Sequence, residues 1–361
     1  MALLRFLASW LAVLWTTTWT TAQERPKRDR TFAVDAVQLQ RGSEERGKAE
    51  FSVQRGKFTY LFATEANRDE FTKEPARYEI QWGGACGRMG PLSGEGSVHM
   101  YTVHDRKLFL FASEQCRTGF LKAPHLMLEG PDPGLKPNAS ASERGRALLA
   151  RAVDAMGGAE RIDAVRTYFQ RQETEAASGA RTYRVVKTKW FDFAGNLRSD
   201  ESWDGSGWAT VRSAGAAFTL PAGEDLAELQ VSAFEREMGH LLIAVLRTRN
   251  RDDAVVLHRG TGRIGKQEIE YVTVSCAGTN RTLGIDPSSG RVLTLGFRGR
   301  GPNLTVGRIE HRFADWRKVG EIELPFAWSA VFEGDPAPEL AMALDMVEID
   351  KSPPAELFQR K

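Results

Sequence analysis

Two cysteines and two histidines in residues 86–116 carry side chains that could bind a metal ion. Cys86 lies in the glycine-rich run GGACGRMG, Cys116 lies in SEQCRTGF, and His99 and His104 stand between them. The pattern Cys-x12-His-x4-His-x11-Cys has the ligand types of a zinc site but lacks the short paired spacings of a zinc motif. GSVHMYTVHD has the pattern of a strand, so the two histidines face one ion only where the strand ends or bulges between them.

A softer set of ligands is present in the same stretch. Thiol and thioether sulfur atoms suit Cu(I), and the residues that supply them, with one further imidazole, are Cys86, Met89, Cys116, His125 and Met127. The candidate ions are therefore copper and zinc. Two other outcomes stay open for the thiols. Cys86 and Cys116 could form a disulfide that ties the glycine turn to the next helix, or they could remain a free, redox-active pair.

The elements that must position these residues come from a sequence pattern that occurs twice. FTYLFATEANRDEFTKEP, residues 58–75, matches KLFLFASEQCRTGFLKAP, residues 107–124, and Cys116 takes the place of Asn67. In each copy an aromatic strand runs into Thr64 or Ser113, whose hydroxyl can cap a helix that a proline closes about nine residues later. Each copy is thus predicted to be a strand–helix unit. Cys116 falls in the first turn of the second helix, where the helix N-terminus favours a thiolate.

The first copy and the turn after it carry a family resemblance. The run LFATEANRDEFTKEPARYEIQWGGACGRMG resembles the YHS domain, in which an aromatic strand, a helix and a Gly-Gly-x-Cys turn follow one another. LFASEQCRTGF, in the second copy, is similar to the ending of the related TRASH-type metal-binding domains. The resemblance implies a small YHS-like module over residues 31–130 that binds a metal ion or a partner.

The first residues have the pattern of an export signal. Arg5 precedes an apolar run from Phe6 to Trp15, and Thr20-Thr21-Ala22 offers small residues for cleavage after Ala22. The apolar run is about half as long as a bilayer-spanning helix. We therefore expect a signal peptide over residues 1–22 and a periplasmic or secreted protein that is not integral to the membrane.

Charge and motifs argue against several classes of protein. The chain has 49 Lys and Arg against 47 Asp and Glu, whereas nucleic-acid binders show a clear basic excess. HRGTGRIGK contains Gly-x-Gly-x-x-Gly, but an alternating strand follows it instead of the helix that a dinucleotide site needs. The sequence contains no nucleophile elbow and no His-Glu-x-x-His. We expect a protein that is not an enzyme and has no nucleic-acid partner.

The prolines and small polar residues of 131–143 predict a linker, and a second module is expected over residues 144–361. It opens with the helical stretch RALLARAVDAMGGAERIDAV, broken at Gly157-Gly158. Strands follow, separated by turn signals such as DGSG, DPSSG and RGRGPN, with one internal helix near Ser232 to Leu246. Arg298 and Arg300 are interpreted as part of a solvated glycine loop.

These features, in this order, resemble the bacterial lipoprotein-carrier superfamily, that is, LolA/LolB-like outer-membrane lipoprotein-sorting proteins. The matching pieces are MGGAERIDAVRTY, WDGSGW, LGIDPSSGRVL, FADWRKVGEIELPFAW and VEIDKSPPAELF. The resemblance implies a curved antiparallel half-barrel wrapped around helices, with an apolar cavity for a lipid or lipoprotein acyl chain. Phe326, Trp328 and Phe332 alternate onto one strand face, where they either line that cavity or form the packed core.

The sequence therefore predicts an α+β protein, with a small YHS-like module of two strand–helix units followed by an antiparallel half-barrel that has an N-terminal helix. The leading hypothesis is a binding protein in which the first module takes a metal ion or a partner and the half-barrel takes an apolar ligand or a partner. One alternative is a thiol-based redox or heavy-metal-handling protein that acts through Cys86 and Cys116. The other is an inert interaction scaffold.

Overall fold

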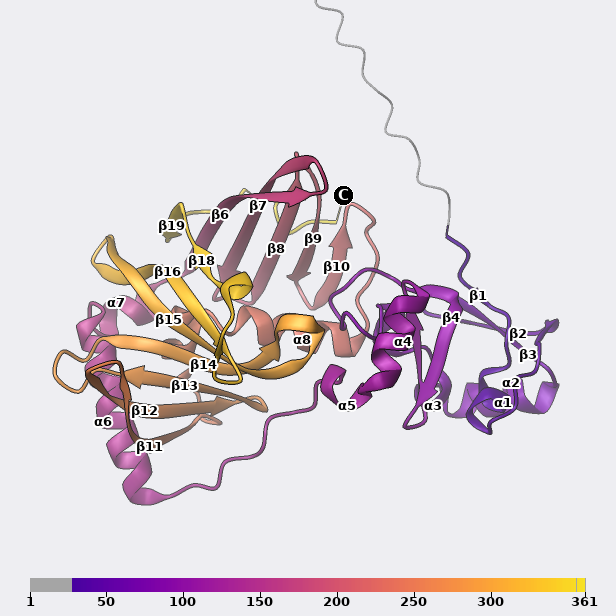
Figure 1. Cartoon of the computed structure of the whole chain (residues 1–361), viewed down its shortest axis with the longest axis horizontal. Helices are drawn as coiled ribbons and strands as arrows, with labels where there is room; N and C mark the ends of the chain where they lie inside the picture. The colour runs from indigo at the N-terminus through magenta and orange to yellow at the C-terminus, as the bar shows by residue number, and fades with distance from the viewer. Residues whose placement is uncertain (1–27, 355, 361) are drawn as a thin grey trace, which may run out of the picture.

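The computed structural model describes residues 28–354 and 356–360, so the expected signal peptide lies outside the described residues. The chain has an N-terminal half with two small sheets and a C-terminal half with two larger antiparallel sheets (Figure 1). Within residues 28–354 and 356–360, no helix combines the length and the apolar character needed to cross a bilayer.

The N-terminal half repeats one unit, as the sequence predicts. The first copy forms β3 (Phe58–Phe62) and α2 (Glu65–Lys73); it is preceded by β1 (Thr31–Phe32), α1 (Ala36–Gln40) and β2 (Lys48–Arg55) and followed by α3 (Pro75–Tyr78). The second copy forms β5 (Lys107–Phe111) and α4 (Glu114–Lys122); it is preceded by a 3-10 turn, η1 (Gln81–Gly84), and β4 (Ser97–His104) and followed by α5 (Pro124–Met127). Strand β3 pairs with β2 and β1, and β4 pairs with β5.

The helix starts of the two copies are equivalent. The hydroxyl of Thr64 accepts the backbone N–H of Asn67 at 3.2 Å, and that of Ser113 accepts the N–H of Cys116 at 3.2 Å. These contacts satisfy backbone amides that the first turn of a helix leaves free. Both helices have 9 residues, and a proline follows each one within two residues. The predicted pair of strand–helix units is confirmed.

The C-terminal half opens with α6 (Ala139–Ala155) and α7 (Ala159–Ala164), which are separated by Gly157 and Gly158 at φ 128° and 96°. Helix α6 begins inside the stretch predicted as linker, because the side chain of Asn138 caps it by accepting the N–H of Ala141. The predicted internal helix is two helices, α8 (Glu228–Met238) and α9 (Leu242–Thr248). The chain leaves the helix between them at Gly239-His240.

Two antiparallel sheets form the body of this half. One has the order β10-β9-β8-β7-β6-β19, from β6 (Thr167–Ser178), β7 (Arg181–Asp192), β8 (Asn196–Trp203), β9 (Ser206–Ser213), β10 (Ala216–Leu220) and β19 (Met346–Ile349). The other runs in chain order through β11 (Val255–Ile264), β12 (Gln267–Cys276), β13 (Thr279–Ile285), β14 (Val292–Arg300), β15 (Val306–Val319), β16 (Ile322–Phe332) and β17 (Asp335–Pro336). Strand β18 (Met342–Ala343) pairs with β16, and η2 (Pro302–Leu304) and η3 (Pro338–Leu340) are short 3-10 turns.

The sheets curl around the helices, and the expected antiparallel half-barrel with an N-terminal helix is confirmed (Figure 1). Apolar residues of α6 and α9, such as Leu149 and Val245, form one core with Val272, Val274 and Leu283 of the larger sheet. Residues that alternate with these on β12 and β13 therefore face the other side of the sheet. The run Gly-x-Gly-x-x-Gly lies in β11 and the turn to β12, so it forms a β-hairpin.

Candidate functional sites

The three histidines of the predicted metal site do not gather around the cysteines. His99 is exposed, and its Nε2 lies 3.5 Å from a carboxylate oxygen of Asp29. The Nε2 atom of His104 lies 3.3 Å from the carboxylate of Asp105, and His125 is exposed. Across residues 28–354 and 356–360, no three His, Cys, Asp or Glu side chains are grouped closely enough to hold a metal ion.

The sulfur atoms of this region do come together. Cys86 is fully buried and Cys116 partly buried, and both are free thiols. They belong to one apolar cluster with three thioethers and four aromatic rings, from Met89, Met100, Met127, Trp82, Phe109, Phe111 and Phe120. We call it the sulfur-rich cluster. Sequence reasoning included Met89 and Met127 but missed Met100. The strand pattern of GSVHMYTVHD shows that Met100 is next to His99 in the chain. It does not show how this strand is aligned with β5, so it could not bring Met100 to the cysteines.

Backbone N–H groups surround the sulfur of Cys86. The N–H of Ala112 donates to its Sγ at 3.5 Å. Burial raises the pKa of the Cys86 thiol, the N–H groups of Ala112, Met89 and Arg88 lower it, and a charge on Cys116 raises it further. The net direction is upward, so Cys86 is held as a thiol while it is reduced.

The three aromatic residues predicted to line an apolar cavity have different surroundings. Phe326 is 6% exposed and packs in the main core, and the partly buried Trp328 packs against the same core. The ring of Trp328 stacks on His311 with 5.2 Å between centroids. Phe332 covers Gly301 and Gly307, where a Cβ atom would lie 2.2 Å and 2.6 Å from its ring. None of the three lines either cavity of the groove described next.

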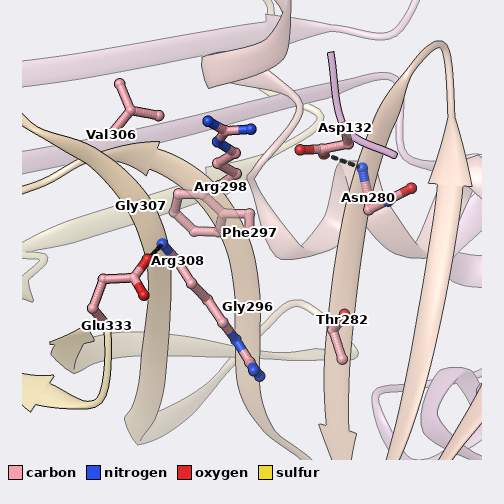
Figure 2. Close-up of a pocket in the computed structure, with 10 residues that line it drawn as sticks. All are labelled: Asp132, Asn280, Thr282, Gly296, Phe297, Arg298, Val306, Gly307, Arg308 and Glu333. Atoms are coloured by element: carbon pink, nitrogen blue, oxygen red, sulfur yellow. Dashed lines mark hydrogen bonds between the residues drawn. The ribbon is translucent and has the colours of Figure 1, made fainter. Parts of the chain in front are cut away.

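A groove lies on the face of the larger sheet opposite the helices. It consists of two adjoining cavities of about 350 and 440 Å³, which share Asn280, Thr282 and Arg308. The first is also lined by Asp132, Gly296, Phe297, Arg298, Val306, Gly307 and Glu333 (Figure 2). The second is also lined by Leu135, Arg259, Tyr271 and Thr273. We call these two cavities together the sheet groove.

The segment between the two halves forms one wall of the sheet groove. The backbone N–H of Asn280 donates to Asp132 Oδ2 at 2.6 Å (Figure 2). The side-chain amide of Asn280 donates to the carbonyl of Pro133 at 2.9 Å. The N–H of Asp132 in turn donates to Gly278 at 3.2 Å. These bonds fix Asp132 in the first cavity and bring Leu135 into the second.

Arginines dominate the charge of the sheet groove. Arg259 and Arg298 are exposed, and neither makes an ion pair or hydrogen bond through its guanidinium with the described part of the chain. The guanidinium of Arg308 lies 3.9 Å from Glu310, and Glu333 accepts the backbone N–H of Arg308. The sequence placed Arg298 and Arg300 in a solvated loop, which is wrong, because β14 continues to Arg300 and carries Arg298 onto the groove face. No local signal in the sequence brings Arg259, Arg298 and Arg308 to one face, because they come from three strands.

Comparison with known proteins gives distant likenesses only. No family model and no curated protein matches the chain. Similar solved structures include a DUF1329 family protein from Desulfovibrio piger, with 10% identity and a TM-score of 0.38, and a putative outer membrane lipoprotein-sorting protein domain from Vibrio parahaemolyticus, with 10% identity and a TM-score of 0.37. A LolA superfamily protein from Nitrosomonas europaea is similar at 10% identity with a TM-score of 0.41.

Each of these three likenesses covers 60% of this chain and 97% of the other. Two of the names belong to the superfamily that residues 145–361 resemble, while none of the three is a YHS domain, so the YHS resemblance stays a prediction. A likeness at this level carries no inference about ligand or activity, and such an inference has to come from the chain's own sites.

Proposed function

We propose that this chain is a non-catalytic binding protein whose half-barrel holds an anionic, amphipathic ligand in the sheet groove. The observation that carries the proposal is the meeting of two cavities, of about 350 and 440 Å³, at Arg308, with Arg259 and Arg298 on either side. Each volume lies in the range of small-molecule sites. The proposal keeps the expectation that the protein is exported, with a signal peptide that ends before Gln23.

The charge pattern selects the polar end of the ligand. A guanidinium binds a carboxylate or a phosphate through two parallel N–H···O bonds, so arginines that have no protein partner favour an anion of this kind. Asp132 and Glu333 also border the first cavity, so the anionic group is expected nearer to Arg259, in the second cavity.

The apolar end of the ligand has its own surface. Val306 and the Cα atoms of Gly296 and Gly307 provide apolar contacts in the first cavity, while the ring of Phe297 packs on the helix side of the sheet against His240. A fatty acid or a lysophospholipid with an anionic headgroup combines the two features. The lipid ligand predicted from the sequence is thereby retained, but its site moves from the strand face of Phe326 to the opposite side of the sheet.

Binding of myristate to the purified full chain, measured by calorimetry, tests the proposal. Arg259→Gln is expected to weaken binding by about tenfold or more, which corresponds to the loss of one charge-assisted contact. Arg263→Gln is the matched control, because Arg263 is exposed on the same strand, carries the same charge and lines neither cavity. The uncharged analogue myristyl alcohol should bind more weakly than myristate. Equal affinities for the two variants, or no binding of myristate to the unmodified chain, would overturn the proposal.

A further inference from the structure

The helix start of the first repeat is held by a buried carboxylate and an amide. Asp35 is 0% exposed, and its Oδ2 atom accepts the backbone N–H of Ala63 at 2.8 Å and the side-chain amide of Asn67 at 2.7 Å. Its Oδ1 atom accepts the N–H groups of Val37 and Gln38 at 2.9 and 3.1 Å. Asp35 and Asn67 thus join α1, the end of β3 and the first turn of α2. We call this pair the polar clasp.

The second repeat has two thiols in the corresponding places. Ala112 corresponds to Ala63, and Cys116 corresponds to Asn67. The N–H of Ala112 donates to Cys86 Sγ, as the N–H of Ala63 donates to Asp35. Cys86, like Asp35, is 0% exposed. The pair Cys86 and Cys116, here called the thiol clasp, therefore stands where the first repeat has a hydrogen bond between side chains.

Accessibility differs between the two thiols in a way that suits stepwise chemistry. Cys116 is partly exposed in the first turn of α4, whereas Cys86 lies beneath it in the sulfur-rich cluster. Arg88 lies along α4, where its guanidinium donates to the carbonyl of Gln115 at 3.3 Å and meets Gly119. Cys116 is therefore the thiol that an external disulfide can reach first, and Cys86 is the buried thiol that can follow it.

We propose that the thiol clasp is a redox modification site, in which a disulfide between Cys86 and Cys116 replaces the hydrogen bond of the polar clasp. The oxidant is a disulfide-bearing molecule, written R–S–S–R. The thiolate of Cys116 attacks one of its sulfur atoms, forms a mixed disulfide and releases one thiolate RS⁻. Cys86 then loses its proton to that thiolate, attacks Cys116 Sγ and releases the second RS⁻. Counted from the dithiol, the protein loses two electrons and two protons, and the oxidant takes them up and leaves as two molecules of RSH.

One contact connects this chemistry to the half-barrel. Arg300, at the end of β14, donates to the carbonyls of Arg88 at 3.3 Å and Met127 at 2.9 Å, on two sides of the sulfur-rich cluster. Arg298, two residues earlier on β14, lines the sheet groove. The turn that contains Cys86 is thus in contact with the strand that borders the groove. The inference does not depend on what the groove binds.

Mass spectrometry of the reduced full chain exposed to glutathione disulfide under native conditions tests the inference. The expected product is lighter by two hydrogen atoms, has a Cys86–Cys116 cross-linked peptide, and has Cys276 as a free thiol that is alkylated once the product is denatured. Thermal unfolding should occur at a higher temperature for this product than for the reduced chain, because the cross-link restricts the unfolded state, and dithiothreitol should reverse the shift. A native chain that stays reduced, or that stops at a glutathione adduct on Cys116, would refute the inference.

The first repeat supplies the matched variant. Cys86→Asp combined with Cys116→Asn introduces the residues of the polar clasp into the second repeat. This double variant should fold, and its unfolding temperature should not change when glutathione disulfide is added. Cys276→Ala should respond as the unmodified chain does. A second contradicting result would be that the chain binds Cu(I) stoichiometrically and that glutathione disulfide then no longer forms the cross-link. This result would assign the thiols to a soft-metal site. The measurement on the unmodified chain decides the question even if the double variant does not fold.

Discussion

The burial of His311 is expected to make the stability of the fold depend on pH. Its ring lies between Phe297 and Trp328, with centroids 5.0 and 5.2 Å away. Burial, together with the charge of Lys189, lowers its pKa to about 4 from the ordinary 6.5. The unfolded chain therefore takes up a proton on His311 at a higher pH than the folded chain does. Stability is expected to fall as the pH drops from about 6.5 to about 4.

Urea denaturation at several pH values in that window measures this effect. His311→Phe keeps an aromatic ring in the stack and removes the proton site, so its free energy of unfolding should depend less on pH than that of the unmodified chain. Some dependence should remain, because burial also lowers the pKa of His240 well below its ordinary value. Identical pH dependence in the two proteins would show that His311 is protonated as easily in the folded chain as in the unfolded one.

Arg281 is a buried charge whose removal is expected to stabilise the fold. It is 7% exposed, it has no hydrogen bond or ion pair with the described residues, and burial lowers its pKa to about 10. Arg281→Met keeps an unbranched, flexible side chain and removes the desolvated charge, so the free energy of unfolding should rise by about 1 kcal/mol or more. Arg249→Met is the contrasting variant, because Arg249 pairs with Asp163 at 2.8 Å and its loss should destabilise. Urea denaturation that gave both variants the same sign would contradict this account.

At the scale of single elements, the repeated helices depend on their caps. Thr64→Ala leaves the N–H of Asn67 without its acceptor and should cost about 1 kcal/mol of stability. Thr72→Ala, within the same helix, removes only a hydroxyl that donates to the carbonyl of Arg68, and should cost far less. Thermal unfolding of the two variants makes the comparison. Equal losses would mean that the hydroxyl of Thr64 does not hold the start of α2.

Elements with local signals could be predicted from the sequence, and those that depend on long-range register could not. The capping residues and the prolines fix α2 and α4 within a few positions of the chain, and Gly157-Gly158 ends α6 for the same reason. The end of β14 could not be predicted, because glycines at this point of a sequence usually indicate a turn. In the structure they belong to the strand because they pair with β15, as Gly299 does with Gly307. The sulfur-rich cluster was predicted in part, and the sheet groove not at all, because three strands and a connecting segment contribute to it.

At the scale of the whole molecule, the two halves are joined by buried and partly buried hydrogen bonds. The amide of Gln230, in α8, donates to the carbonyl of Pro91 at 2.9 Å, and Arg300 donates to Arg88 and Met127. Arg236, also in α8, pairs with Glu129. The halves are therefore expected to unfold together.

Arg300→Leu should weaken that coupling. It removes a partly buried guanidinium that donates to three carbonyl groups, and a loss of about 2 kcal/mol or more is expected, with a broader or two-step unfolding transition. Arg298→Leu, which removes an exposed guanidinium on the same strand, should leave one sharp transition. Hydrogen exchange followed by mass spectrometry would locate the change, which should include the turn of Cys86. A single transition of unchanged width in Arg300→Leu would count against the coupling.

The wall that Asp132 and Leu135 form beside the sheet groove has a practical consequence for dissecting this protein. A proline-rich stretch between two halves is the usual place to cut a chain for separate expression, or to insert a reporter. A shortened C-terminal fragment that starts at Asn138 would keep α6 and the core it covers, yet it would lack the residues that bond to Asn280. Such a fragment could fold and still present a wider, shallower groove. Fragments intended for ligand screening should therefore start before Pro131.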